Sequence, residues 1–551
     1  MGNGTRNHGT RPAQGKQVKS HDPDATGAGT SSIVKALRDN PILVAFVALA
    51  LIVRLIFWFY TGRVWEDALI TITAARNVWE GVGLTHHASE PHVQSFTSPI
   101  SVLIPILGEL FNAGLLVLRL SSLAASIATI YFAYRIGVLL GFRWVAHVFV
   151  LTYLACDQLQ IFFGMAGMET QVVTAIAVGT LYFYLDRSWW KLGVACGCAA
   201  LSRPEFVMFL LPPVGVALLL FHRGALLKVA IPALALALPW YVFATLYYGS
   251  PVPNTIVAKS WSYQIGLFSA SWKEMWGFTI RSWRDYAPFK EFWLSYEAPL
   301  PDISLKIILA LVLLLFLAGL VSSARRKSGL LIAGMAFIGF VAYRNSTIMN
   351  SYYMWYLPPF TALLFLVAGQ GLSELAGKGS WPANALGIIL ALCYALPLPF
   401  SMPLDKMVQE KIEANVRERT GYTLAGMMKD PGDTVVLEPL GFMGWAAFNK
   451  TVYDFPGLGS KVAVRATKNL SPPRVAGLLD ALQPTHAVLR PNEFGDLMRR
   501  FPQTAARYEV AARIRTEPGL TLQNMGYGYR IIDNDFRILR RTRDFDQVVR
   551  P

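Results

Sequence analysis

Two adjacent acids, Glu66 and Asp67, open the most polar stretch in the first half of the sequence, WEDALITITAARNVWEGVGLTHHASEPHVQSFTSP at residues 65–99. This stretch is expected to be a loop between two apolar membrane helices. Paired carboxylates at a membrane boundary repel each other and lose hydration, which favours either a cation between them or a raised pKa on one of them. A carboxyl group with a raised pKa suits a general base. The alternative is that both acids only begin a helix, whose dipole favours negative charge at this end.

The rest of the stretch carries groups that can contact polar substrates. Three of them are the histidines His86, His87 and His92, but an adjacent pair followed five residues later by a third lacks the regular spacing of zinc ligands. We therefore predict substrate contacts rather than zinc ligation. A divalent cation, if the reaction uses one, would be held by Glu66 and Asp67. The candidate substrate-binding residues of this stretch are Arg76, Asn77, His86, His87 and Thr97.

The composition indicates that these residues belong to a membrane protein. Of the 551 residues, 54% are hydrophobic and only 15% are charged, which is typical of an integral membrane protein. The net charge of +15 would suggest nucleic-acid binding in a soluble protein, but membrane proteins concentrate Lys and Arg in their cytoplasmic turns. We expect no nucleic-acid partner. The four cysteines lie in apolar segments, so neither a disulfide framework nor a zinc cluster is expected.

About eleven apolar segments predict a polytopic α-helical membrane protein. Residues 1–40 are expected to form a disordered cytoplasmic tail, because they contain few large apolar side chains. Residues 100–111 are too short to span and are expected to lie at the membrane surface. With the N-terminus inside, the basic turns at Arg143, Arg187 and Arg325 fall on the cytoplasmic side, as the positive-inside rule requires. The predicted spans are residues 41–60, 115–139, 144–162, 170–186, 190–203, 206–221, 226–246, 303–322, 328–343, 354–373 and 383–401.

The polar motifs fall together on the outer side in this topology, and they predict an extracytoplasmic polar cavity. Arg203 either caps a broken span through a local ion pair or binds phosphate through its guanidinium group. Arg119 either extends toward the membrane surface or binds an anionic ligand. The motifs are residues 65–99, GMET at 167–170, SRPE at 202–205, YYGSPVPNTIVAK at 247–259 and YRNSTIMNSYYMWY at 343–356. The further candidate substrate-binding residues are Arg119, Glu169, Arg203, Glu205, Asn254, Lys259, Arg344 and Tyr353.

The C-terminal residues have the composition of a small soluble α/β domain, and the odd number of spans places them outside. TVVLEP at 434–439, THAVLR at 485–490 and YRIID at 529–533 are predicted to be strands. Helices are predicted at 474–482 and 494–500, and the density of Gly and Pro in residues 441–461 predicts a loop that lies over another part of the molecule. The expected organisation is therefore a tail at 1–40, a transmembrane catalytic domain at 41–402 with a catalytic outer loop at 61–113, and an extracytoplasmic α/β domain at 403–551.

Taken in order, the motifs resemble the GT-C glycosyltransferases of the arabinofuranosyltransferase-like type. WEDALITITAARNVWEGVGL followed by FTSP is similar to that family's first outer loop, DDA-[YF]-I, R-x-A-x-N, G-x-G-L and GYTNP. GMET, SRPE and YYGSPVPNTIVAK are similar to SGLET, TRPE and YYG-x-x-x-PNT-x-x-AK, and VYDFPGLGSK to the VVDLLGL stretch of the terminal domain. The likeness spans about residues 41–460. Glu66 stands where the family has its first Asp, and TITAAR and SFTSP also depart from the pattern, so the acceptor-side contacts do not carry over.

The resemblance implies a GT-C fold and an inverting transfer of arabinofuranose, or another pentose or hexose, from a polyprenyl-phosphate donor. The acceptor would be a hydroxyl of a cell-envelope glycan or glycolipid outside the bacterial cytoplasmic membrane. Asp67 matches the family's acidic position and is the candidate general base, with Glu66 beside it. The departing phosphate needs positive charge, which Arg203, Lys259, Arg344 or Arg119 could supply.

Two other functions remain open. One is a transporter or flippase of a lipid-linked glycan, and the other is an oligosaccharide polymerase or ligase with a diphosphate-linked donor. Transporters usually place polar residues near the membrane midplane and contain internal repeats, whereas this sequence gathers them at one boundary and shows no repeat.

Overall fold

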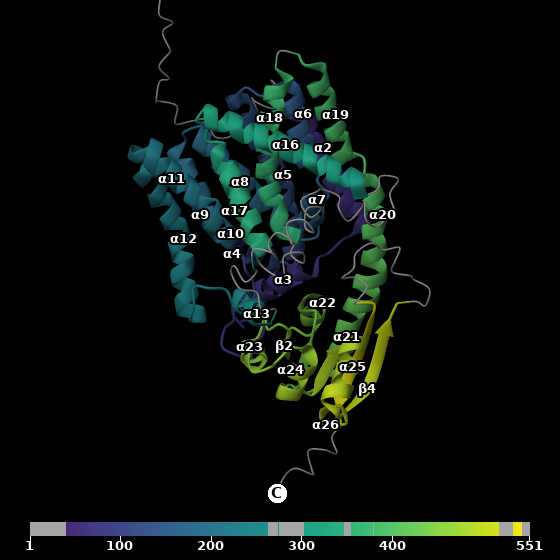
Figure 1. The fold of residues 1–551 in the computed structure, drawn as a ribbon. Helices are drawn as coiled ribbons and strands as arrows, with labels where there is room; N and C mark the ends of the chain where they lie inside the picture. The colour runs from purple at the N-terminus through teal and green to yellow at the C-terminus, as the bar shows by residue number, and fades with distance from the viewer. Residues whose placement is uncertain are drawn as a thin grey trace, which may run out of the picture. The chain divides into compact units, whose positions relative to one another are not determined.

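The structure is a computed structural model that describes residues 40–262, 271, 274, 302–346, 354–377, 379–516 and 533–542 (Figure 1). Residues 46–551 form one compact unit. Residues 1–45 form another unit, of which 40–45 are described as the start of a helix. Apart from Asn40, the predicted cytoplasmic tail lies outside the described residues, and so does Tyr353.

Eight helices among the described residues are long and apolar enough to cross a membrane. All eight coincide with predicted spans, and the other three predicted spans coincide with the shorter helices α8 (Thr170–Leu185), α9 (Trp189–Ser202) and α17 (Leu331–Ser346). The chain is therefore a multi-pass helical membrane protein, as predicted. The eight are α2 (Pro41–Thr61), α5 (Gly114–Leu140), α6 and α7 (Trp144–Met165), α10 and α11 (Pro204–Phe221), η1 and α12 (Arg223–Tyr248), α16 (Asp302–Arg325), η3 and α18 (Met354–Ala376) and the run from α19 to α21 (Trp381–Met427).

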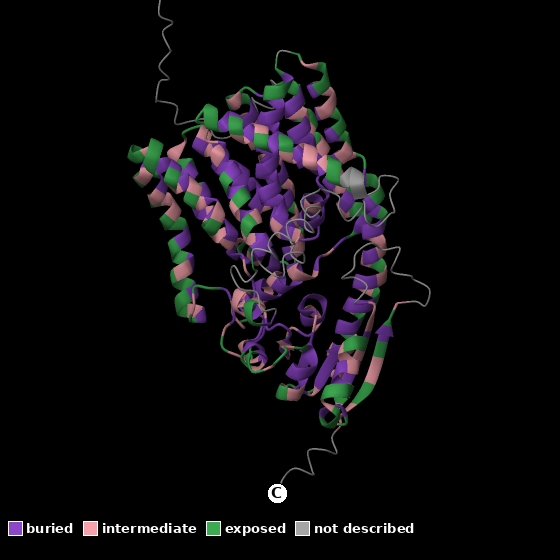
Figure 2. Cartoon of the chain, in the orientation of Figure 1, coloured by how far each residue is buried: buried purple, intermediate pink, exposed green. Residues whose placement is uncertain are grey.

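Helix α18 (Leu357–Ala376) forms the centre of the bundle and is buried along almost its whole length (Figure 2). Its closest neighbour is α16, and two glycines permit the approach. A Cβ atom on Gly319 would lie 1.9 Å from the carbonyl oxygen of Val367, and one on Gly371 would lie 1.9 Å from that of Leu315. Small residues at a crossing let two helix backbones touch, which is how membrane helices gain packing contacts.

The predicted outer loop at 61–113 contains two helices. α3 (Glu66–Trp79) begins at the two adjacent acids. The alternative prediction, that both acids begin a helix, therefore agrees with the local structure. α4 (Pro99–Glu109) coincides with the predicted surface helix, and Ser98 caps it by accepting a hydrogen bond from the N–H of Ser101. Between them, residues 80–98 form the irregular part of the stretch.

The last helical run leads into the C-terminal domain, with a turn at residues 396–397. It consists of α19 (Trp381–Ala395), α20 (Leu398–Val408), the π-helical segment η4 (Gln409–Glu418) and α21 (Arg419–Met427). A five-stranded sheet follows, with the order β2-β1-β3-β5-β4. Strands β2, β1 and β3 are parallel, whereas β5 runs antiparallel to both of its neighbours. The strands are β1 (Thr434–Leu437), β2 (Thr451–Asp454), β3 (His486–Leu489), β4 (Tyr508–Arg515) and β5 (Asp535–Arg541).

The α/β character of this domain was predicted, but its strands only in part. β1 and β3 match predicted strands, and α24 (Val475–Leu482) and α25 (Pro491–Arg500) match predicted helices. Of the strand predicted at 529–533, only Asp533 is described, and it lies in a turn. The loop predicted at 441–461 was partly wrong, because it contains most of α22 (Leu440–Ala446) and all of β2. Pairing with β1, which is not visible in the local sequence, makes these residues a strand.

Candidate active site

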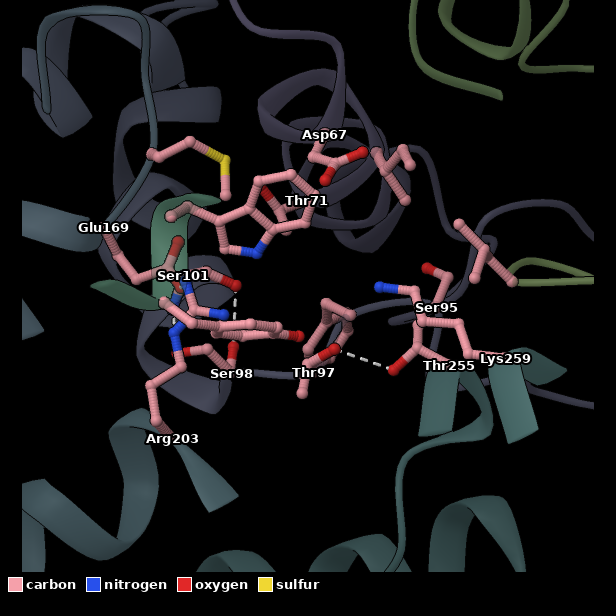
Figure 3. Close-up of a pocket in the computed structure, with 16 residues that line it drawn as sticks. Asp67, Thr71, Ser95, Thr97, Ser98, Ser101, Glu169, Arg203, Thr255 and Lys259 are labelled. Carbon is pink, nitrogen blue, oxygen red and sulfur yellow. Dashed lines mark hydrogen bonds and ion pairs between the residues drawn. The ribbon is translucent and has the colours of Figure 1, made fainter. Parts of the chain in front are cut away.

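A polar cavity lies where α3 meets α4, α13 (Asn254–Ser262) and the C-terminal domain (Figure 3). It contains about 440 Å³ of space that is not occupied by protein atoms, part of which is open to solvent. A cavity at which a few polar groups converge is typical of a ligand site. The lining residues are Asp67, Ile70, Thr71, Ser95, Phe96, Thr97, Ser98, Ser101, Met168, Glu169, Arg203, Thr255, Lys259, Trp355, Tyr356 and Leu458.

Asp67 lines this cavity because of where α3 begins. Trp65, the residue before the helix, is extended, and its N–H donates a hydrogen bond to the carbonyl of Ala166 at 2.9 Å. Its indole packs against Phe162 and Trp355. These contacts fix the first turn of α3, in which consecutive side chains diverge by about 100°. Asp67 consequently lines the cavity, and its neighbour Glu66 does not.

Four charged side chains line the cavity. Arg203 and Glu169 form a buried ion pair, with 2.5 Å between Nη2 and Oε1. Lys259 lies beside the indole of Trp355, with Nζ 5.8 Å from the ring centre. Burial raises the pKa of Asp67, against the attraction of Lys259, and burial lowers the pKa of Lys259, against the attraction of Asp67. The charge of Arg203 is thus balanced by Glu169, and Asp67 and Lys259 stabilise each other's charged form.

Hydroxyl groups form much of the remaining wall. Thr97 and Thr255 share a hydrogen bond of 2.8 Å that joins the outer stretch to α13 (Figure 3). Ser95 is buried, and its hydroxyl has no hydrogen-bond partner within the described residues. Hydroxyls both donate and accept, so this wall suits a ligand that carries hydroxyl groups of its own. Thr71, Ser98 and Ser101 complete the set.

Glu66 faces the C-terminal domain. Its Oε2 lies 3.6 Å from Nη1 of Arg417, and its side chain is 19% exposed. Burial raises the pKa of Glu66 to about 8, with Arg417 opposing the shift. Among the described residues, no group of three or more His, Cys, Asp or Glu side chains is arranged to hold a metal ion.

Four candidate residues of the outer stretch, Arg76, Asn77, His86 and His87, lie outside the cavity lining. Asn77 donates hydrogen bonds from its amide to the carbonyls of Thr85 and His86. The guanidinium of Arg76 stacks on Trp445, 3.6 Å from the ring centre. His86 is fully buried, which lowers its pKa to about 3, and Nε2 of His87 lies 3.4 Å from Glu90. These contacts organise the stretch and its packing against the C-terminal domain.

Four more candidates, Arg119, Glu205, Asn254 and Arg344, also do not line the cavity. Arg119 donates hydrogen bonds to the carbonyls of Met165 and Arg63, so it holds the backbone that leads into α3. Asn254 donates to the carbonyls of Gly457 and Leu458. Glu205 and Arg344 are buried. The candidates that the structure brings together at the cavity are Asp67, Thr97, Glu169, Arg203 and Lys259.

Several lining residues lie inside the polar motifs but are not among the predicted site residues. Ser95 and Ser98 belong to SFTSP, Thr255 to PNT, and Trp355 to the YRNSTIMNSYYMWY motif. Leu458 belongs to VYDFPGLGSK, so the C-terminal domain supplies one wall of the cavity. The motifs thus marked the segments that line the cavity, but they did not identify these individual residues.

Comparison with known proteins gives one family match and a group of structural neighbours. Residues 409–532 match a family described as a domain of unknown function (DUF8728). No curated protein matches the sequence. The fold is similar to that of ArnT from Cupriavidus metallidurans bound to undecaprenyl phosphate, with a TM-score of 0.53, 14% identity, and coverage of 94% of this chain and 99% of that chain. For ArnT from the same organism in the apo state the values are 0.52, 13%, 93% and 98%.

The likeness to ArnT extends over nearly the full length of both chains. It confirms the expected fold class, a GT-C-type polytopic helical membrane protein with a small sheet domain at its C-terminus.

Proposed function

We propose that this protein is a membrane glycosyltransferase that moves a sugar from a polyprenyl-phosphate donor to an acceptor hydroxyl outside the bacterial cytoplasmic membrane. The observation that carries the proposal is that Asp67 and Lys259 line one polar cavity of a GT-C-type fold. The undecaprenyl phosphate in the ArnT structure supports a polyprenyl-phosphate ligand. The sequence motifs favour arabinofuranose, or another pentose or hexose, and a cell-envelope glycan or glycolipid as acceptor.

The chemistry follows from three groups of residues. Ionised Asp67 accepts the proton of the acceptor hydroxyl while that oxygen bonds to the anomeric carbon of the sugar. The bond from this carbon to the phosphate oxygen breaks on the opposite face, so the configuration inverts and the electron pair leaves on the polyprenyl phosphate. Lys259 stabilises the negative charge that develops there. The hydroxyl wall around Thr97 and Thr255 binds the hydroxyls of the sugar.

The test is transfer by the purified protein in liposomes, with radiolabelled polyprenyl-phosphate pentose and hexose donors. Asp67→Asn keeps the shape of the side chain but removes the base, and we expect it to lower the rate by about 10²-fold or more. The matched control is Glu80→Gln, which changes an exposed acid beyond the other end of α3 and leaves the rate unchanged. Full activity of Asp67→Asn would exclude Asp67 as the base, and no transfer by the wild type with any donor would overturn the function.

The two alternatives predict different products. A transporter moves a lipid-linked glycan across the liposome bilayer without chemical change, and a polymerase or ligase transfers an oligosaccharide from a diphosphate-linked donor. Mass spectrometry of the lipid and acceptor fractions separates the three activities.

The proposed topology, with the N-terminus in the cytoplasm, has its own test. We introduce a cysteine at Met498, an exposed position of the C-terminal domain. Labelling of Met498→Cys by an impermeant reagent in intact cells is expected, whereas labelling only after lysis would reverse the orientation.

A further inference from the structure

A π-helical segment at the start of the C-terminal domain lies beside the beginning of α3. Within η4, the three polar residues Gln409, Glu413 and Arg417 recur at every fourth position, and all of them contact residues 63–66. π-helical segments are rare, and they frequently occur at functional sites. This arrangement indicates that the segment holds the start of α3 in place.

The contacts to Arg63 and Val64 fix the chain just before the helix. Oε1 of Gln409 accepts hydrogen bonds from Nη1 of Arg63 and from the backbone N–H of Val64, both at 3.0 Å. Nη2 of Arg63 also donates to Glu413 at 2.9 Å, and the side chains of Arg63 and Glu413 are fully buried. The entry to α3 is thus held by an enclosed polar network.

Arg417 extends this network to the helix itself. Its Nη1 lies 2.9 Å from Oε2 of Glu413 and 3.6 Å from Oε2 of Glu66. The same guanidinium pairs with Asp533, which anchors it in the C-terminal domain. At 3.6 Å the contact between Arg417 and Glu66 is an ion pair rather than a hydrogen bond.

We propose that Arg417 is a positioning residue for sugar transfer, which holds Glu66 and so fixes the first turn of α3 with Asp67 facing the cavity. Arg417 does not line the cavity and therefore acts through Glu66 rather than on the substrate. Geometry at this point matters because a misplacement of about 1 Å can cost about 10²-fold in rate. The inference rests on the proposed function, and it gives a role to the region 409–532 that matches a family of unknown function.

The first test measures kcat and the donor KM separately. We expect Arg417→Gln to lower kcat by about tenfold or more, with the donor KM changed by less than about threefold, because substrate contacts are retained. Arg417→Lys keeps the positive charge but lacks the planar guanidinium that can donate to several carboxylates at once. Its kcat should therefore lie between those of Arg417→Gln and the wild type. An unchanged kcat in Arg417→Gln would overturn the proposal.

The matched control is Arg490→Gln. Arg490 pairs with the same Asp533, at 2.5 Å, and with Glu438, at 3.0 Å, so it belongs to the same buried network without contacting α3. We expect its kcat to stay at the wild-type value. An equal loss in Arg490→Gln and Arg417→Gln would mean that the network only stabilises the domain.

A double-mutant cycle tests whether Arg417 acts through Glu66. In a Glu66→Ala background the contact is already absent, so Arg417→Gln should lower kcat by less than about twofold. The same tenfold loss in both backgrounds would show that Arg417 acts by another route.

A structural readout separates this inference from the proposed function. Hydrogen exchange of the backbone amides at residues 69–72, which donate to the carbonyls at the start of α3, should be faster in Arg417→Gln than in the wild type. If that variant does not fold, Glu66→Ala removes the same contact and should give the same increase. Absence of transferase activity in the wild type would overturn the function alone, whereas unchanged exchange in the folded variant would overturn the positioning role.

Discussion

Asp67 on α3 and Lys259 on α13 line the same cavity, and each favours the charged form of the other. The two residues lie in separate motifs of the sequence and on separate helices. The proposed base therefore interacts with the proposed stabiliser of the leaving phosphate. A substitution of either residue should change the pKa of the other.

The pH dependence of transfer should show this coupling. Burial raises the pKa of Asp67, and the base is inactive when protonated, so kcat should fall as the pH drops through this raised pKa. Lys259→Gln removes the charge that opposes the shift, so the acid limb of the profile should move to higher pH, in addition to any loss of rate. Lys468→Gln, an exposed control outside the cavity lining, should leave the limb in place. An unmoved limb in Lys259→Gln would contradict the coupling.

Glu66 should make stability depend on pH. Burial raises its pKa from 4.5 to about 8, against Arg417. Because the folded state holds this proton more tightly than the unfolded state, the contribution of Glu66 is complete below pH 4.5 and is lost as the pH rises through about 8. Glu66→Gln cannot titrate, so its Tm relative to the wild type should rise over this range in one detergent. Parallel curves of Tm against pH for Glu66→Gln and the wild type would refute the shift.

Removal of one partner from the Arg203–Glu169 ion pair should lower the free energy of unfolding. Arg203→Gln leaves Glu169 buried without its ion-pair partner, and breaking such a pair costs about 3–5 kcal/mol in the free energy of unfolding. The double variant with Glu169→Gln should lose less than Arg203→Gln alone. Denaturant unfolding in micelles measures both.

An exposed ion pair of the same length provides the control for that experiment. Arg326 and Glu374 are also 2.5 Å apart, but their side chains are 55% and 36% exposed. Arg326→Gln should therefore change the free energy of unfolding by less than about 1 kcal/mol. Similar losses from the two arginine variants would show that burial does not set the cost.

Gly441 should be intolerant of a side chain. A Cβ atom there would lie 2.3 Å from the carbonyl oxygen of Glu66, so Gly441→Ala must push α22 away from α3. We expect kcat to fall by about tenfold to 10²-fold, because Asp67 is displaced with the helix. Gly495→Ala, on α25, has open space for its Cβ and should keep the wild-type kcat. Equal rates for the two variants would show that the packing of α22 does not position α3.

The membrane helices and the polar stretch that contains Asp67 could be predicted from the sequence. Hydropathy and charge at the turns are local properties, and all the predicted spans coincide with helices in the structure. The motif around Asp67 could be selected because acids, amides and histidines are rare beside apolar segments. In the C-terminal domain, β1 and β3 were predicted because they are short, almost fully buried apolar runs. The strands β2, β4 and β5, in which buried residues are interrupted by more exposed ones, were not predicted.

The tertiary structure decided which of the selected residues reach the cavity. Glu66 and Asp67 are adjacent acids, and the sequence alone does not show which of them lines the cavity. Because α3 begins after Trp65, Glu66 faces Arg417 and Asp67 faces the cavity. Lys259 reaches the same cavity because α13 packs there. Arg76 and His86 belong to the same polar stretch as Asp67 but lie outside the cavity lining, because side-chain direction depends on helix phase and long-range packing rather than on proximity in sequence.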